Sequence, residues 1–437
     1  MNDALSLALG RQIELQRQSL VRLIFLLYIL LIFEGALRKW VAPGLSNPLL
    51  FIRDPFLLMI YFKALQQNRM AMRNLLDYGL LISIGLIALA MLQVMMGDIP
   101  LVVAGYGLRN YILYLPLPFV MYANMAPLET IRLIRLLLTL SIPLGALGVI
   151  QSYLPVDHFL NQGIGEGDVF TAGNQVRTYG TFSFTAGHGN YLTMMMPIAA
   201  GAFLFFAAGS RERHLAVLSI LSLSCAAVTS GSRGVIVGLV ITAALFILIV
   251  ALTGGGRNIL GAVMATLMVA MLATVSYFAF SEQFENITAR FQAADEVEGS
   301  IVDRALTPLT KLGDAIGDGS LLGVGVGKGT GGGSYLGTGS QELVLSEEET
   351  FRIIQECGAL LGVLYVLYRF LLLFAAVRIA MFSLKFAGNP IPALLIAFMA
   401  PSLLVGQITL NNTSNGFNWL GLGLLFCASQ LPAQQRG

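Results

Sequence analysis

The residues whose types and spacing most suggest chemistry follow a long polar interruption in an otherwise apolar chain. An acidic cluster, Glu347, Glu348 and Glu349, is followed by Arg352 and Glu356. Because Glu348, Arg352 and Glu356 are spaced at i, i+4 and i+8, a helix here would place a carboxylate, a cation and a carboxylate on one face. Charges at a membrane boundary are costly and suggest function. The pattern therefore predicts acid–base chemistry or binding of a charged ligand, although the carboxylates would also stabilise a helix N-terminus.

A glycine-rich run at 323–333 lies in the same interruption. It lacks the ending of a phosphate-binding P-loop, because Lys328 is followed by Gly329 rather than by Ser or Thr. Since glycine has no Cβ, we expect this run to pack closely or to let the backbone approach a ligand.

Isolated arginines and one histidine form a second set of candidates. Arg177, in QVRTYGTFSFTAGHGN, and Arg233, in TSGSRGVIVG, are surrounded by small residues. Their guanidinium groups would suit phosphate oxygens, the alternative being an interfacial anchor. Arg109 lies within an apolar segment, where it would either bind a ligand or extend to the interface. His188 is a candidate base or sugar ligand, or else a structural polar group.

The composition is that of a polytopic membrane protein. Of the 437 residues, 56% are hydrophobic and only 11% are charged, whereas soluble domains carry about 25% charged residues. Arg53 and Asp54 are adjacent, and we expect them to form a local ion pair, because intramembrane charges usually pair. The three cysteines and three histidines are scattered, so we expect no disulfide framework, no metal site and no cofactor.

Apolar segments of about 20 residues predict transmembrane helices. The N-terminal segment has no small-residue cleavage site before Glu34 and is predicted to remain as an anchor. We count about twelve spans, near 20–37, 48–65, 75–96, 102–123, 131–153, 189–208, 214–230, 233–252, 258–279, 353–378, 390–409 and 416–431.

The distribution of Lys and Arg predicts the orientation of these spans. With both termini cytoplasmic, every short inner loop is basic, and Arg38 and Lys39 are the exception on the outer side. The fold class is therefore all-α, with residues 1–437 forming one polytopic membrane domain. Two long loops, 154–190 and 281–352, fall on the outer side, and the second is expected to contain short helices. The inner-side basic residues are Lys63, Arg69, Arg73, Arg132, Arg135, Arg211, Arg213, Arg257, Arg378, Lys385 and Arg436.

Four segments together resemble the bacterial O-antigen polymerase and O-antigen ligase superfamily, the Wzy- and WaaL-like membrane glycosyltransferases. They are RTYGTFSFTAGHGNYLTMMMP, TSGSRGVIVGLV, the stretch from Asp303 and Arg304 through SLLGVGVGKGT, and EETFRIIQECGALLG. Each motif is weak alone, whereas their order, spacing and common side make the resemblance fairly specific.

The resemblance implies transfer of a glycan from a polyprenyl diphosphate carrier to an acceptor hydroxyl, at the outer face of the bacterial inner membrane. It implies no nucleotide and no metal. Arg177 and Arg233 match the motif arginines that would hold the diphosphate, and Arg304 matches the arginine of the outer loop. The implied partners are the lipid-linked donor, a glycan or lipid-linked acceptor, the bilayer and a chain-length regulator, with no nucleic acid.

One departure from the family pattern bears on the reaction. Ligases of the family usually have a His-Asn pair where this chain has Glu347 and Glu348. The departure favours a polysaccharide polymerase, with a carboxylate as base whose proton affinity is adjusted by Arg352, and with His188 as the rival base. A ligase that transfers finished glycan to lipid A core, and a transporter of an anionic solute or lipid-linked glycan, are the alternatives.

Overall fold

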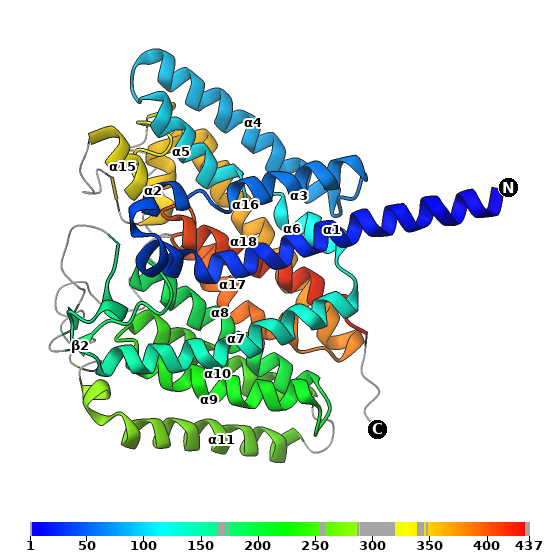
Figure 1. Cartoon of the computed structure of the whole chain (residues 1–437), viewed down its shortest axis with the longest axis vertical. Helices are drawn as coiled ribbons and strands as arrows, with labels where there is room; N and C mark the ends of the chain where they lie inside the picture. The colour runs from blue at the N-terminus through cyan, green and yellow to red at the C-terminus, as the bar shows by residue number, and fades with distance from the viewer. Residues whose placement is uncertain are drawn as a thin grey trace.

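The computed structural model describes residues 2–164, 171–172, 175–253, 258–285, 288, 320–338, 345–346 and 348–432. Figure 1 shows that this part of the chain folds into a bundle of helices that cross it back and forth. The longer helices are α1 (Asn2–Ala36), α3 (Asp54–Gln66), α4 (Arg73–Met96), α5 (Leu101–Ile112), α6 (Leu117–Asn124), α7 (Pro127–Tyr153), α8 (Thr185–Phe205), α9 (Arg211–Thr229), α10 (Arg233–Thr253), α11 (Asn258–Ala279), α16 (Glu349–Ala387), α17 (Ile391–Val405) and α18 (Asn412–Ala428).

Short elements connect these helices on one side of the bundle. A π-helix, η1 (Leu37–Val41), continues α1 and leads to η2 (Pro43–Leu45) and α2 (Ser46–Leu49). The loop after α7 contains η3 (Phe159–Asn161) and an antiparallel pair, β1 (Thr171–Ala172) and β2 (Gln175–Val176). The short helix α15 (Gly331–Thr338) lies within the second long loop, as predicted.

Each of the twelve predicted segments overlaps a helix, which confirms the all-α class. Six of the described helices are long and apolar enough to cross a membrane: Arg11–Val41, α4, α7, α9, α10 and α16. The predicted segment 102–123 is instead two helices, α5 and α6. Their junction contains Pro116, which lacks the N–H that would continue the helical ladder. The full count of twelve crossings stays a prediction.

The helix ends alternate between two sides of the bundle (Figure 1). The start of α1, the end of α3 and the starts of α4, α7 and α9 lie on one side, together with the end of α18. Basic residues assigned to the inner side lie at these helix ends, as Lys63, Arg73 and Arg211 do, whereas Arg257 and Arg436 lie outside the described residues. The starts of α8, α10, α16 and α18 lie on the opposite side, where the candidate site residues are concentrated.

The centre of the bundle is formed by α18, in which every residue from Gly416 to Ala428 is buried. The largest apolar cluster joins it to α1, α6, α7, α8, α9 and α17. Helices approach closely where small residues meet, as where Gly145 of α7 lies against Ser222 of α9. On the periphery, α4 and α11 expose large apolar side chains such as Met95 and Phe278, as lipid-facing helices do.

Helix α16 is interrupted near its start. Gly358 has φ 75° and ψ 165°, so residues 349–357 form a separate helical segment before the long helix continues. A side chain at Gly358 would collide with the backbone of Leu321, because a Cβ there would lie 2.1 Å from the Leu321 carbonyl oxygen. The break therefore gives the second long loop a place to pack against the bundle, next to the predicted acidic cluster.

Candidate functional site

Arg177 follows β2 and lies between two buried residues, Val176 and Thr178. Thr178 Oγ1 is 2.9 Å from Nδ1 of His188, on the first turns of α8. The main chain on both sides of Arg177 is therefore packed into the bundle, although the residue belongs to a long loop. No acceptor among the described residues bonds to the buried Nε of Arg177.

Arg233 begins α10 in the same neighbourhood. Helices α8 and α10 pack together here, and a Cβ at Gly189, which follows His188, would lie 3.5 Å from Cγ2 of Val235, two residues from Arg233. Burial lowers the pKa of the Arg177 guanidinium, and the positive charge of Arg233 lowers that pKa further. Arg177, on the loop after β2, and Arg233, at the start of α10, thus lie in one neighbourhood, where both positive charges would favour a bound anion.

His188 is packed inside the bundle, with 1% of its surface exposed. Its ring stacks on Phe182 at 6.3 Å between centroids, and its Nδ1 contacts Thr178. The buried Nε2 has no hydrogen-bond partner among the described residues. Direct contact of this histidine with a sugar or acceptor stays a prediction, and its burial favours a positioning role.

Arg109 and Arg53 are both paired, but not as adjacent charges would suggest. Arg109 Nη2 donates to Asp54 Oδ1 at 2.7 Å, and Arg109 Nη1 also donates to the Asn412 side chain. Arg53 Nε donates instead to Glu34 Oε2 of α1 at 2.7 Å. The expected Arg53–Asp54 ion pair is wrong, because each residue has a better oriented partner on another helix. Arg109 therefore forms an internal pair, which is neither of the two possibilities considered from the sequence, and its role in ligand binding stays a prediction.

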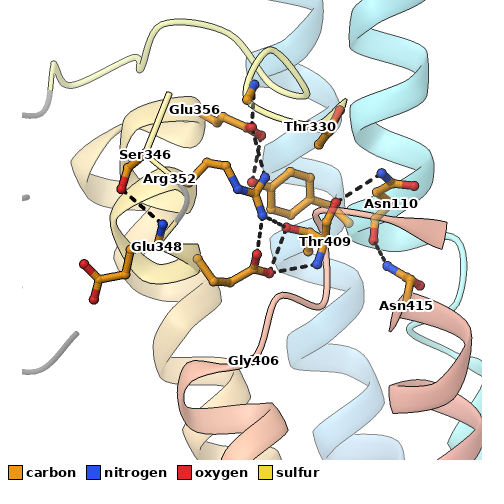
Figure 2. A network of polar contacts seen from close by, with 12 residues as sticks. Asn110, Thr330, Ser346, Glu348, Arg352, Glu356, Gly406, Thr409 and Asn415 are labelled. Carbon is orange, nitrogen blue, oxygen red and sulfur yellow. Dashed lines mark hydrogen bonds and ion pairs between the residues drawn. The ribbon is translucent and has the colours of Figure 1, made fainter. Parts of the chain in front are cut away.

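The acidic end of α16 forms a buried ionic network, which Figure 2 shows from close by. Arg352 is fully buried; its Nη1 donates to Glu356 Oε1 at 3.1 Å, and its Nη2 donates to Glu349. The Glu349 carboxylate also accepts the backbone N–H of Thr409 at 2.8 Å and its hydroxyl at 3.0 Å. Arg369 Nη1 lies 3.5 Å from Glu349 Oε1.

The predicted ridge of Glu348, Arg352 and Glu356 is wrong at its first member. Glu348 is the N-cap of α16, with an extended backbone at φ −74° and ψ 120°, so the helical periodicity does not include its side chain. In Figure 2 that side chain points away from the network, and Glu349 supplies the first carboxylate. Roles for Arg352 and Glu356 in contact with substrate stay predictions; their complete burial favours a structural role.

The glycine run packs closely, as predicted, and its partner is the carboxylate of Glu356. The N–H groups of Gly327 and Gly329 donate to this carboxylate at 2.9 and 2.8 Å, and the Tyr111 hydroxyl donates at 2.8 Å. Successive backbone N–H groups commonly form such concave anion sites. The loop thus binds an anion supplied by its own chain.

Sequence reasoning missed several members of this network. Arg369, in the apolar segment VLYRFLLL, could have been found as a charge that requires a partner. It also donates to the carbonyl groups of Leu403, Ser402 and Gly406 at the end of α17. Thr409 carried no comparable signal, because its role depends on where the turn after α17 meets α16.

Two candidates, Glu347 and Arg304, lie outside the described residues. Within the described part of the chain, no group of three or more His, Cys, Asp or Glu side chains is arranged to hold a metal ion. Comparison with known protein families and with curated proteins found no match to this chain.

Proposed function

We propose that this protein is a membrane glycosyltransferase that polymerises a bacterial surface polysaccharide or exopolysaccharide. The proposal is carried by the placement of Arg177, on the loop after β2, and Arg233, at the start of α10, on one side of the bundle. Guanidinium groups provide a planar set of donors that fits phosphate oxygens. The buried Nε of Arg177 has no acceptor among the described residues, and this supports a ligand with strong acceptor oxygens.

In the proposed reaction, the hydroxyl of an acceptor glycan attacks the anomeric carbon of the donor sugar. The bond from that carbon to the diphosphate oxygen breaks as the new glycosidic bond forms, and the polyprenyl diphosphate leaves. Arg177 and Arg233 stabilise the negative charge of the leaving group. A general base accepts the hydroxyl proton, so the reaction needs no oxidant, reductant or nucleotide.

Glu348 is the proposed base. It lies at the start of α16, on the side of the bundle that also contains the starts of α8 and α10. Its N–H donates to Ser346 Oγ at 3.1 Å, and its carbonyl accepts the N–H of Arg352 at 2.9 Å. Its backbone is therefore fixed to the buried network, while its side chain points away from that network in Figure 2.

The proposed setting is the bacterial inner membrane, with about twelve crossings and cytoplasmic termini. In this arrangement the pair α5 and α6 makes one broken crossing, and α3, α17 and α18 make short ones. The arginine pair and Glu348 then belong to the outer face, where a lipid-linked donor and an acceptor glycan are available. A chain-length regulator is the further partner that a polymerase would require.

Complementation tests the proposal in a strain that lacks the native gene and carries Arg177→Ala, Arg233→Ala or Glu348→Gln. We expect each variant to shorten or abolish the long-chain polymer, while Arg211→Ala, which changes an arginine on the opposite side, retains it. Membrane abundance and monodispersity of each variant establish that it is folded. Normal polymer in all three variants would overturn the proposal, and glycan found attached to a final lipid acceptor would identify a ligase.

A further inference from the structure

The loop at 178–183 is buried although it has no regular secondary structure. All six of its residues are buried, including Thr178, Gly180 and Ser183, and Arg177 immediately precedes it. Buried backbone N–H and C=O groups require partners, which a loop cannot supply by a regular ladder. Side chains from three other segments supply partners for the backbone of Gly180 and Thr178, and we call residues 178–183 the clamped loop.

Gln151 of α7 binds the centre of the clamped loop. Its Oε1 accepts the N–H of Gly180 at 2.7 Å, and its Nε2 donates to the Gly180 carbonyl at 3.1 Å. One side-chain amide thus satisfies both backbone groups of a single residue. Gly180 has φ +55°, a conformation that favours glycine, so the loop turns at the point where Gln151 holds it. Gln151 also donates to Leu160 at 2.7 Å, which ties the start of the long loop to the same amide.

The end of α1 and the π-helix η1 hold the other side of the clamped loop. Lys39 Nζ donates to the Gly180 carbonyl at 3.2 Å, and Arg38 Nη1 donates to Ser183 Oγ at 3.2 Å. Gly35 leaves no room for a side chain, because a Cβ there would lie 2.5 Å from Ser183 N. Arg38 and Lys39, the exception to the predicted charge distribution, are therefore buried against this loop.

The first turns of α8 hold the beginning of the clamped loop. His188 contacts both the hydroxyl and the carbonyl of Thr178, the residue next to Arg177. Because Gly189 packs against α10, this contact also relates the loop to Arg233. The three attachments, from α7, from η1 and from α8, leave Arg177 at the edge of a fixed segment.

We propose that Gln151, Lys39 and His188 are positioning residues that hold Arg177 beside Arg233 for binding of a diphosphate group. The inference rests on the proposed function for its ligand. None of the three residues is required to touch the diphosphate; each acts through the clamped loop. The contacts to the clamped loop fix the position of Arg177 before a ligand binds. This preorganisation lowers the entropic cost of binding a charged ligand.

Two measurements on the full chain in lipid nanodiscs test this proposal: hydrogen exchange of the backbone and calorimetric titration with inorganic pyrophosphate. Gln151→Leu removes both contacts to Gly180, and Lys39→Met removes a second, separate contact to the same carbonyl. Gln93→Leu is the matched control, because Gln93 is an equally buried amide that holds a different loop. Its Nε2 donates to Leu322 at 2.6 Å, and its Oε1 accepts the Val326 N–H at 2.8 Å.

We expect Gln151→Leu and Lys39→Met to speed hydrogen exchange at 178–183, and Gln93→Leu to speed it only around 322–326. Pyrophosphate affinity should fall about tenfold in the first two variants, the equivalent of about one charged hydrogen bond, and stay unchanged in Gln93→Leu. In an Arg177→Ala background, Gln151→Leu should have no further effect, because both changes act through one arginine.

The same measurements separate failure of the clamp from failure of the proposed function. If hydrogen exchange at 178–183 is unchanged in both Gln151→Leu and Lys39→Met, these residues do not hold the clamped loop, and the proposal is overturned. The two variants could also exchange faster while their affinity for pyrophosphate is unchanged, or Gln151→Leu could lower that affinity equally with and without Arg177. Either result would show that the contacts to the clamped loop do not act through Arg177. Absence of pyrophosphate binding by the unaltered chain would instead overturn the diphosphate site, while the exchange data would still decide the clamp.

Discussion

The backbone N–H of Gly327 donates to Oε2 of Glu356 at 2.9 Å, joining the second long loop to the buried start of α16. Gly329 donates to the other oxygen of the same carboxylate. A glycine-rich run that could bind a phosphate in another setting thus binds an internal anion. The loop is attached to the bundle at a residue whose charge is also shared with Arg352.

Removal of the Glu356 carboxylate should destabilise the protein. Glu356→Ala leaves Arg352 with one fewer anion in a fully buried site and leaves two backbone N–H groups without their acceptor. Loss of one partner from a buried ion pair typically costs about 3–5 kcal/mol. Thermal unfolding in detergent should show a clear decrease in stability, whereas the control Asp77→Ala, at an exposed carboxylate of α4, should unfold close to the unaltered protein. Equal stability of the two variants would contradict the structural role of Glu356.

The close approach of the glycine loop to α5 should not tolerate a side chain. Gly327 has φ +90°, and a Cβ there would lie 2.6 Å from the Cα of Gly107. Gly327→Ala should therefore cost more than the ~1 kcal/mol that is gained when alanine replaces glycine at a compatible site. Gly331→Ala is the matched control, because nothing lies within 4 Å of its Cβ position. Unfolding temperatures compare the two variants, and a neutral Gly327→Ala would exclude the tight packing.

Arg177 should be replaceable by lysine only in part. Lysine retains the positive charge but loses the planar fork of donors that binds phosphate oxygens. We expect Arg177→Lys to retain a fraction of pyrophosphate binding and Arg177→Ala to weaken it about 10- to 100-fold, in line with the 1.5–3 kcal/mol of a charged hydrogen bond. Titration at two salt concentrations checks this order. A lysine variant as weak as the alanine variant would indicate that geometry, rather than charge, dominates the site.

Arg109 and Asp54 should behave as one unit. Either Arg109→Leu or Asp54→Leu leaves a partly buried charge without its ion-pair partner and should destabilise the protein. The double variant removes both charges, so its stability should be higher than the sum of the single effects predicts. A double-mutant cycle on unfolding temperature measures this coupling. Additive effects would contradict the pairing and would make Arg109 available again as a ligand-binding residue.

The amino-acid sequence by itself determined where helices form and which of their ends lie on the same side. Apolar segments and the Lys and Arg residues between them are local patterns, and each predicted segment overlaps a helix. Close packing of the glycine run was one of two alternatives predicted from the sequence, because the absence of side chains is a property of the residues themselves. Glu348, by contrast, was assigned to a helical ridge, because three successive glutamates, none of a preferred N-cap type, do not show at which residue the helix begins.

Only the tertiary structure decided which polar residues far apart in the sequence meet, whereas the Arg352–Glu356 pair follows from local helical spacing. Glu34 lies 19 positions from Arg53, Asp54 lies 55 positions from Arg109, and Thr409 lies 60 positions from Glu349. Ion pairs and hydrogen bonds form over a few ångströms, so they depend on the packing of distant segments rather than on spacing along the chain. The same reason applies to Gln151: nothing in its own helix indicates that its amide holds the loop beside Arg177, because the contact exists only once α1, α7 and α8 are packed around that loop.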